Sequence, residues 1–388
     1  MQFGQFVMPC HDHRENPTLS FERDLSYIQY LDSLGFDEVW VGEHHSGGWE
    51  NIPSPEMFLA AAAQRTSRIR LGTGVVILPY HHPFQVAERI AFLDHLSHGR
   101  AILGVGGGGL PTDVRLMGID RDTMRKMYDE SLEIIMRLLR TDGPVTYEGQ
   151  FWTLREAELQ VKSYQQPHVP VAITSVGGSD HSIHLAAHYR LPYLVTDFRN
   201  GIDPVQMRDI WTKMDAAGKA QGYTPPRSDF SIVSYVYVAE TRKQALEQIE
   251  HGVIRDLDQY FFHLGWRSVY EDYPGQPTSE MTIEQVARKG RIVVGDPDDV
   301  IRWIKDLDEV TGGFGTLLIT AAQWSNTDQW KRSQELFARY VIPEFKGANR
   351  GTKRAHEQLV ANSLAGTLPP TAIHPQPTTA PPKKNGKG

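Results

Sequence analysis

The sequence lacks the features that mark several protein classes. It has a single cysteine, Cys10, in 388 residues, which excludes an internal disulfide and any zinc or iron-sulfur site held by several cysteines. It has no run of about 18 apolar residues, the length that a transmembrane helix needs, and no basic segment followed by an apolar one at its start. Its net charge of −7 gives no reason to expect nucleic acid or an anionic membrane as a partner. These absences predict a cytoplasmic protein.

The pattern that is present is an alternation of strands and helices. Hydrophobic residues make up 40% of the chain and charged residues 22%, which is the balance of a soluble globular protein. Short runs rich in β-branched residues alternate with longer segments of helical periodicity, as in a parallel sheet. Eight strands are predicted, at residues 2–6, 38–42, 70–78, 101–106, 171–175, 193–197, 232–238 and 316–320. Eight strands separated by helices favour an α/β fold with a closed (β/α)8 TIM barrel over an open sheet.

Two connections are too long for a simple strand-helix unit, so insertions are predicted after strands 4 and 7. The second, at about residues 251–291, is rich in aromatic residues. It would serve as a substrate lid, as a surface that packs against a neighbouring subunit, or as surface decoration, and the sequence leaves these alternatives open. The helices predicted elsewhere include residues 20–34, 55–66, 83–97, 124–140 and a closing helix at 328–345.

The chain changes character after the closing helix. The barrel domain is predicted to span residues 1–346, followed by a C-terminal extension at 347–388. Residues 367–388 are rich in Pro and Thr and have few large apolar side chains. A segment of this composition buries too little apolar surface to fold, so a disordered tail is predicted.

The first candidate site follows the strand at 38–42. In a parallel barrel the catalytic groups follow the C-terminal ends of the strands, and Glu43, His44 and His45 stand at such an end. Histidine is the side chain best suited to proton transfer near neutral pH, although an exposed loop would hold the same residues. With His81 and His82 these histidines resemble a metal site. No helical His pair with a carboxylate accompanies them, so no metal is predicted.

Glycines mark the ends of the next two strands. Gly72 to Val75 ends the third strand, and Gly104 to Gly109 formally satisfies the dinucleotide-binding pattern G-x-G-x-x-G. Residues 110–112 (Leu-Pro-Thr) follow where that pattern needs a helix to begin, and three strands already precede it, so a dinucleotide fold is disfavoured. Glycines at strand ends let a planar ligand approach the backbone; a bend of the barrel is the alternative.

A fourth cluster, Ser175 to Asp180, lies between the fifth strand and a helix. Backbone N–H groups at a glycine-rich turn and a helix N-terminus form an anion site, to which the Ser hydroxyls add donors. A plain helix cap at Ser179 or Asp180 would explain the same residues without a ligand.

Together these segments resemble the luciferase-like monooxygenase family, from residue 1 to about residue 346. The matching segments are GFDEVWVGEHH (35–45), LGTGVVILPYHHP (71–83), HGRAILGVGGG (98–108) and the end of the closing helix, YVIPEF (340–345). Within the family, WENIPSPEMFLAAAA (49–63) and the glycine loop resemble limonene and diketocamphane monooxygenases.

The resemblance implies a cofactor site for FMN at the barrel mouth. It assigns the flavin ring to Gly74, Val75, Gly106 and Gly107. It assigns the phosphate to Gly177, Gly178, Ser179 and Ser182. Family members often have a non-prolyl cis peptide bond under the ring, and the bond between Gly74 and Val75 is the matching place.

The resemblance also implies roles around the flavin. His44, with Glu43 as the second catalytic residue, corresponds to the proton-transfer histidine near the reactive flavin carbon. Gly106 stands where luciferase has a cysteine, so the lifetime of the oxygen adduct is expected to differ. Substrate contacts are predicted for His45, His81, Phe261 and Trp266.

The implied activity is that of a two-component monooxygenase. Reduced FMN from a separate NAD(P)H flavin reductase reacts with O2, and one oxygen passes through a C4a-peroxyflavin to a small apolar substrate such as a terpenoid or cyclic ketone. Epoxidation, hydroxylation and Baeyer-Villiger insertion remain open. A homodimer through the helices at 55–66 and 83–97 is expected. The alternatives are a deazaflavin-dependent oxidoreductase on the same fold and a non-catalytic flavin-binding homologue.

Overall fold

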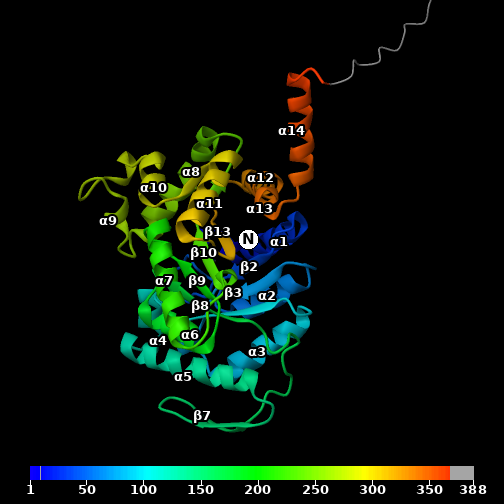
Figure 1. Ribbon diagram of the computed structural model, residues 1–388. Helices are drawn as coiled ribbons and strands as arrows, with labels where there is room; N and C mark the ends of the chain where they lie inside the picture. Colours follow the sequence, from blue (N-terminus) through cyan, green and yellow to red (C-terminus); the bar gives the residue numbers. More distant parts are fainter. Residues whose placement is uncertain (9, 368–388) are drawn as a thin grey trace, which may run out of the picture. The chain divides into compact units, whose positions relative to one another are not determined.

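A closed barrel of parallel strands forms the centre of the molecule (Figure 1). The computed structural model describes residues 1–8 and 10–367. Within these residues the barrel strands, in order round the barrel, are β1 (Gln2–Val7), β2 (Glu38–Val41), β3 (Arg70–Thr73), β5 (Ala101–Gly106), β8 (Val171–Val176), β9 (Tyr193–Thr196), β10 (Phe230–Ser234) and β13 (Thr316–Ala321). The barrel closes where β13 pairs with β1. The TIM barrel and all eight strands expected from the sequence are confirmed.

Two of the strands are shorter than the β-branched pattern predicts. The third strand ends at Thr73, and after a break the chain continues as β4 (Val76–Ile77), which pairs with β5. The seventh strand divides in the same way into β10 and β11 (Val236–Val238). β11 leaves the barrel because it pairs with β12 (Val293–Gly295), the segment that returns from the second insertion.

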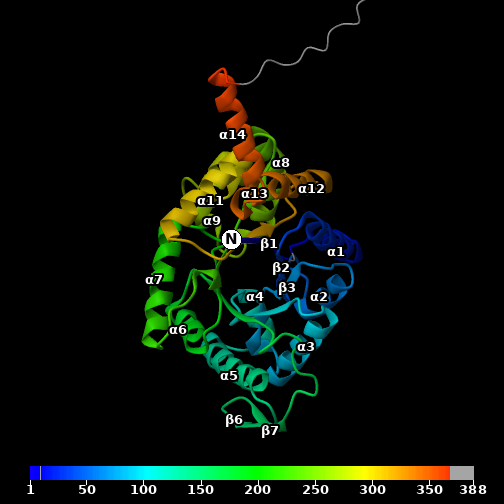
Figure 2. The same ribbon diagram turned by 45° about the vertical axis from the view of Figure 1, so that its right-hand side comes forward.

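Helices surround the barrel in both views (Figures 1 and 2). They are α1 (Pro17–Leu34), α2 (Pro55–Ala63), α3 (Pro83–Leu96), α5 (Arg121–Arg140), α6 (Asp180–Tyr189), α7 (Pro204–Ala220), α11 (Pro297–Thr311) and α12 (Thr327–Leu336). Many begin at a proline after a capping side chain, as at α1, where the Asn16 side chain accepts a hydrogen bond from the Thr18 N–H. The closing helix predicted at 328–345 is α12, a π-helical turn (Phe337–Val341) and α13 (Ile342–Lys346).

The long connections predicted after the fourth and seventh strands are both present. The first contains α4 (Pro111–Met117), α5 and an antiparallel hairpin of β6 (Val145–Glu148) and β7 (Thr153–Ala157). The second contains α8 (Arg242–Asp256), a π-helical turn (Leu257–Phe261), α9 (Arg267–Tyr270) and α10 (Ile283–Lys289).

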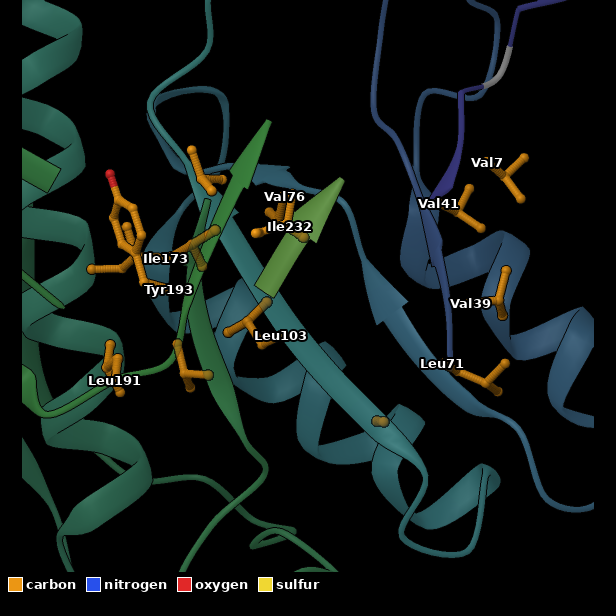
Figure 3. Close-up of a cluster of buried hydrophobic side chains, with 14 of the residues drawn as sticks. Val7, Val39, Val41, Leu71, Val76, Leu103, Ile173, Leu191, Tyr193 and Ile232 are labelled. Atoms are coloured by element: carbon orange, nitrogen blue, oxygen red, sulfur yellow. The ribbon is translucent and has the colours of Figure 1, made fainter. Parts of the chain in front are cut away.

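The alternation of side chains along the strands produces two apolar clusters. An outer cluster packs the strands against the helices, and Figure 3 shows part of it, with Val39 and Val41 directed to the same side of β2. An inner cluster fills the barrel and includes Phe6, Trp40 and Leu318. The inner cluster continues into the second insertion, so the insertion and the barrel interior share one core.

The chain divides into two units between Phe345 and Lys346. In the second unit α14 (Arg350–Leu364) has no buried residue. The disorder predicted for 367–388 concerns residues that, apart from Thr367, lie outside the described part of the chain. Among the described residues, no helix combines the length and the apolar character that crossing a membrane requires.

Candidate active site

His44 lies between two carboxylates at the C-terminal end of β2. Its Nδ1 is 3.0 Å from Asp113 Oδ2 and its Nε2 is 2.8 Å from Glu50 Oε2. Both acids are buried, with side-chain exposures of 0% for Asp113 and 5% for Glu50, whereas 25% of the His44 side chain is exposed. The histidine therefore reaches solvent at the barrel mouth while the acids that hold it do not.

This geometry fixes the charge of His44. Ionised carboxylates only accept hydrogen bonds, so with both acids ionised each imidazole nitrogen carries a proton and His44 is an imidazolium. Burial disfavours the charge, but the Glu50 and Asp113 carboxylates outweigh it and raise the pKa of His44 to about 10. At neutral pH His44 is therefore a proton donor rather than a general base.

The two acids come from different parts of the chain. Glu50 lies on the same loop as His44, which is tied by a hydrogen bond from the His44 N–H to the Ile52 carbonyl. Asp113 lies in α4, and its second oxygen accepts hydrogen bonds from the His45 N–H and the Ser46 hydroxyl. Sequence reasoning missed both acids. The signal available was only that each follows a strand end, and nothing in the spacing pairs them with His44.

Glu43 forms a second group beside the first. Its Oε1 accepts hydrogen bonds of 2.8 Å from both His45 Nε2 and His81 Nε2, and its Oε2 accepts one of 2.9 Å from the Ile77 N–H. Its side chain is 0% exposed. Burial alone would raise the pKa of Glu43, but these donors lower it. Glu43 therefore joins the β2 loop to the segment after β3.

The atoms of Glu43, His45 and His81 lie within 4.8 Å of one another, close enough to surround a metal ion. The surroundings of His81 favour hydrogen bonds instead. Arg89 Nη2 lies 3.4 Å from His81 Nδ1, and because a guanidinium only donates, Nδ1 must accept and Nε2 carries the proton. A metal-bound histidine needs the opposite arrangement, with an acceptor beside its free nitrogen.

The glycines of β3 and β5 have two different purposes. A Cβ on Gly72 or Gly104 would lie 2.5 Å from the Trp40 ring, so these glycines make room for that side chain inside the barrel. The interpretation that they admit a planar ligand is wrong for these two positions. Gly107 differs, because the nearest atom to its Cβ would be 3.9 Å away, on Tyr128. A Cβ at this position would make only an ordinary contact.

The peptide bond between Gly74 and Val75 is cis, as the resemblance predicts. A Cβ on Gly106 would lie 2.8 Å from Val75 Cγ2, so Gly106 and Val75 are direct neighbours. The structure thus brings together Val75, Gly106 and Gly107, which come from two adjacent strand ends.

The turn after β8 brings together the predicted phosphate residues. Gly177 and Gly178 have φ of 70° and 73°, a conformation that favours glycine. A Cβ on Gly178 would clash with Ile210 at 2.5 Å, whereas Gly177 faces open space. Ser179 caps α6, and its hydroxyl lies 2.8 Å from that of Ser182.

Phe261 and Trp266 lie together in the second insertion. Their rings stack at 4.6 Å with an interplanar angle of 12°. Phe261 belongs to the inner cluster that contains Phe6 and Trp40, and Trp266 packs against that cluster. His45 and His81, the other two residues predicted to contact substrate, instead direct their Nε2 atoms to Glu43.

A cavity of about 420 Å³ lies beside the mouth, lined by the ends of β1 and β13 and by α1 and α12. None of the His44, Glu50 and Asp113 group lines it. Its histidine, His11, is already bonded to Asp24 and Asn51. The cavity is therefore separate from the histidine-carboxylate groups.

A parallel barrel with ionised groups and open glycine turns at its mouth defines an enzyme of the TIM-barrel class. The model of the luciferase-like monooxygenase family matches residues 1–312 of this chain. The chain belongs to that family and is an oxidoreductase.

Relatives and a solved structure agree with this assignment. The chain is 39% identical over 358 residues to 4-hydroxyprotoasukamycin monooxygenase of Streptomyces nodosus subsp. asukaensis, covering 92% of this chain and 95% of that protein. It is 36% identical over 349 residues to limonene 1,2-monooxygenase of Rhodococcus erythropolis, covering 89% and 87%. The oxygenating constituent of 3,6-diketocamphane monooxygenase from Pseudomonas putida, solved with FMN, has a TM-score of 0.77 at 26% identity, covering 88% of this chain and 98% of that one. The resemblance to limonene and diketocamphane monooxygenases is confirmed.

Proposed function

We propose that this protein is a monooxygenase that uses reduced FMN and O2 to insert one oxygen atom into a small apolar substrate such as a terpenoid or cyclic ketone. The observation that carries the proposal is the position of His44, which lies between two buried carboxylates and is partly exposed at the barrel mouth. A fixed proton donor at that place suits a reaction in which oxygen is reduced and must be protonated.

The residues at the mouth fit FMN. The backbone at Gly107 lies beside Val75 and Gly106, and a Cβ there would meet no atom closer than 3.9 Å, which suits a flat ring. The open backbone at Gly177, with the Ser179 and Ser182 hydroxyls at the N-terminus of α6, suits a phosphate. We assign the ring to the strand ends of β3 and β5 and the phosphate to the turn before α6. When bound, reduced FMN supplies the electrons that activate O2.

The chain's own residues would control protons, shape and water. His44 holds protons at both nitrogens next to the ring site. Glu43, which is buried, positions the segment after β3 through the Ile77 N–H. We assign Phe261 and Trp266 to the apolar wall over the mouth, because they extend the inner cluster outward. His45 and His81 fix Glu43, and their exposed edges, 16% and 17% of each side chain, would be what the substrate meets.

Two partners are part of the proposal. A separate NAD(P)H flavin reductase would supply reduced FMN. A second copy of the chain would pack on α2 and α3, which lie against each other and expose Met57 by 74% and Phe92 by 57%. Phe92→Glu would then give a monomer where the native chain gives a dimer, as measured by light scattering. A monomeric native chain at micromolar concentration would contradict the dimer.

The function is tested by an uncoupling assay. The protein receives reduced FMN and O2 with a series of apolar compounds, and the assay measures peroxide and oxygenated product. A substrate should convert peroxide release into product formation. Titration with FMN and with a deazaflavin, followed by absorbance, separates the monooxygenase from a deazaflavin-dependent enzyme. Binding of deazaflavin but not FMN, or FMN binding without any oxygen consumption, would contradict the proposal.

A further inference from the structure

A tyrosine of the second insertion hydrogen-bonds to the loop that carries His44. The Tyr260 hydroxyl donates a hydrogen bond of 2.9 Å to Glu50 Oε1, and the other oxygen of Glu50 holds His44 Nε2 at 2.8 Å. The bond to Tyr260 joins residues 210 positions apart in the sequence. An unbroken chain of contacts therefore runs from the insertion to the histidine.

The loop is shaped to receive Tyr260. The ring stacks on Trp49, with centroids 5.9 Å apart and an interplanar angle of 23°. A Cβ on Gly47 would lie 3.2 Å from the ring, and Gly47 has φ of 80°, which favours glycine. Tyr260 is only 3% exposed. The ring thus fills a niche built from the same loop that carries His44 and Glu50.

The backbone that presents Tyr260 is unusual. Tyr260 lies in the π-helical turn Leu257–Phe261, where the Phe262 N–H donates to the Leu257 carbonyl five residues earlier. A π turn adds one residue to a helix and so changes the direction of the side chains that follow, and such turns often occur at functional sites. Here the turn continues α8 and directs a tyrosine to the active-site loop.

We propose that Glu50 and Tyr260 are positioning residues for His44, with Tyr260 holding the Glu50 carboxylate and Glu50 holding the imidazole. The insertion is then part of the proton-holding apparatus and not only a cover over the mouth. Tyr260 acts as a donor and not as an acid, because burial first, and then the Glu50 charge, raise the pKa of its hydroxyl far above neutrality.

The surroundings of the pair leave Glu50 as the link between Tyr260 and the histidine. Titratable groups that face His44 or Glu50 are Asp113, His45, Cys10, Tyr235 and Tyr260. Cys10 and Tyr235 are neutral, since burial raises the pKa of both well above the ordinary value. Asp113 holds the opposite nitrogen of His44 and does not contact Tyr260 by a hydrogen bond.

The test is an NMR titration of the His44 imidazole in the full chain without flavin or substrate, with the signal assigned by its loss in His44→Gln. Glu50→Gln should lower the pKa of His44 by at least about one unit, because it removes an opposite charge in direct contact. Tyr260→Phe should shift it by a smaller amount, because the Glu50 carboxylate keeps its charge but loses the donor that fixes its position. The double variant should match Glu50→Gln alone, since Tyr260 acts through Glu50.

Tyr237→Phe is the matched control. Tyr237 is also buried in the inner cluster and also donates one hydrogen bond, of 2.9 Å to Gln248 Oε1, but it has no contact with Glu50. It should leave the pKa of His44 unchanged. A native pKa in Tyr260→Phe, or effects of the two substitutions that simply add, would overturn the inference.

A kinetic measurement extends the test and rests on the proposed function. Tyr260→Phe and Glu50→Gln should lower kcat by about tenfold or more, the effect of a lost positioning hydrogen bond, and leave the KM for reduced FMN unchanged. Raised KM at native kcat would overturn the positioning role. If the native protein makes no oxygenated product at all, the proposed function fails, whereas the titration result still stands.

Discussion

Two neighbouring groups of the site use the same residue types in opposite proportion. His44 lies between two carboxylates, whereas the Glu43 carboxylate lies between two histidines. In the first group both imidazole nitrogens must donate, so a cation is held between two anions. In the second group one anion accepts from N–H groups, and Arg89 beside His81 shows that this ring needs only one proton. The first group therefore places a cation at the barrel mouth, and the second is a buried anion that joins neighbouring segments of the chain.

The largest effect is expected from His44→Ala, which removes the cation of the first group. Product formation should fall by about 10² to 10⁴, the usual contribution of a positioned acid-base group, and peroxide release should rise. FMN binding should persist, since the proposed ring and phosphate contacts come from other strands. Product and peroxide per reduced FMN are the measurement. Near-native coupling, or a defect in flavin affinity alone, would place His44 outside the chemical step.

The pH dependence of stability is the second test of the comparison between the His44 group and the Glu43 group. The pKa of His44 is raised from 6.5 to about 10 on folding, so its stabilisation is complete below about pH 6.5 and is lost as the pH rises through about 10. Glu50→Gln lowers the folded pKa and so reduces that loss. The measurement is the free energy of unfolding in denaturant, for the native chain and for Glu50→Gln. The native chain should be the more stable of the two at pH 6.5. Its advantage should be smaller at pH 10, by on the order of 3 kcal/mol. Parallel curves for the two proteins would show that Glu50 does not set the charge.

Glu43→Gln tests the second group and should have a smaller effect. Glu43 accepts three N–H donors with its two oxygens, and an amide has one oxygen. At least one donor loses its partner, at a cost of about 1 to 3 kcal/mol of stability. FMN affinity should fall by about tenfold, because the Ile77 N–H belongs to the segment that follows Gly74 and Val75. Lost coupling at native FMN affinity and stability would instead mean that Glu43 takes part in the chemistry.

His82→Ala is expected to change least. His82 belongs to neither group; its side chain accepts a hydrogen bond from the Phe84 N–H at the start of α3, and its ring lies 4.9 Å from that of Trp152. Loss of this cap should cost about 1 kcal/mol of stability, with coupling of oxygen use to product unchanged. Thermal unfolding and the uncoupling assay measure both. A loss of coupling comparable to that of His44→Ala would show that His82, too, takes part in the reaction.

The local features of the chain were predictable, whereas the partners of His44 were not. Each barrel strand is a short β-branched run, and this pattern depends only on neighbouring residues. The breaks after Thr73 and Ser234 were missed because the apolar pattern continues through them. Asp113 lies 69 positions from His44, and Tyr260 lies 210 positions from Glu50. Such contacts depend on how helices and insertions pack, which no local pattern encodes.

The tryptophan inside the barrel limits how this enzyme can be remodelled. The three atoms nearest to a Cβ on Gly72 all belong to the Trp40 ring, so a smaller residue at position 40 would relieve these contacts. A Cβ on Gly104 would also lie 2.1 Å from the Thr73 carbonyl oxygen, and no change at Trp40 relieves that contact. Enlarging the barrel interior beside Gly104 therefore requires coordinated changes in several strands. Phe261 and Trp266 stack on each other in the insertion, so directed evolution toward bulkier substrates should begin there.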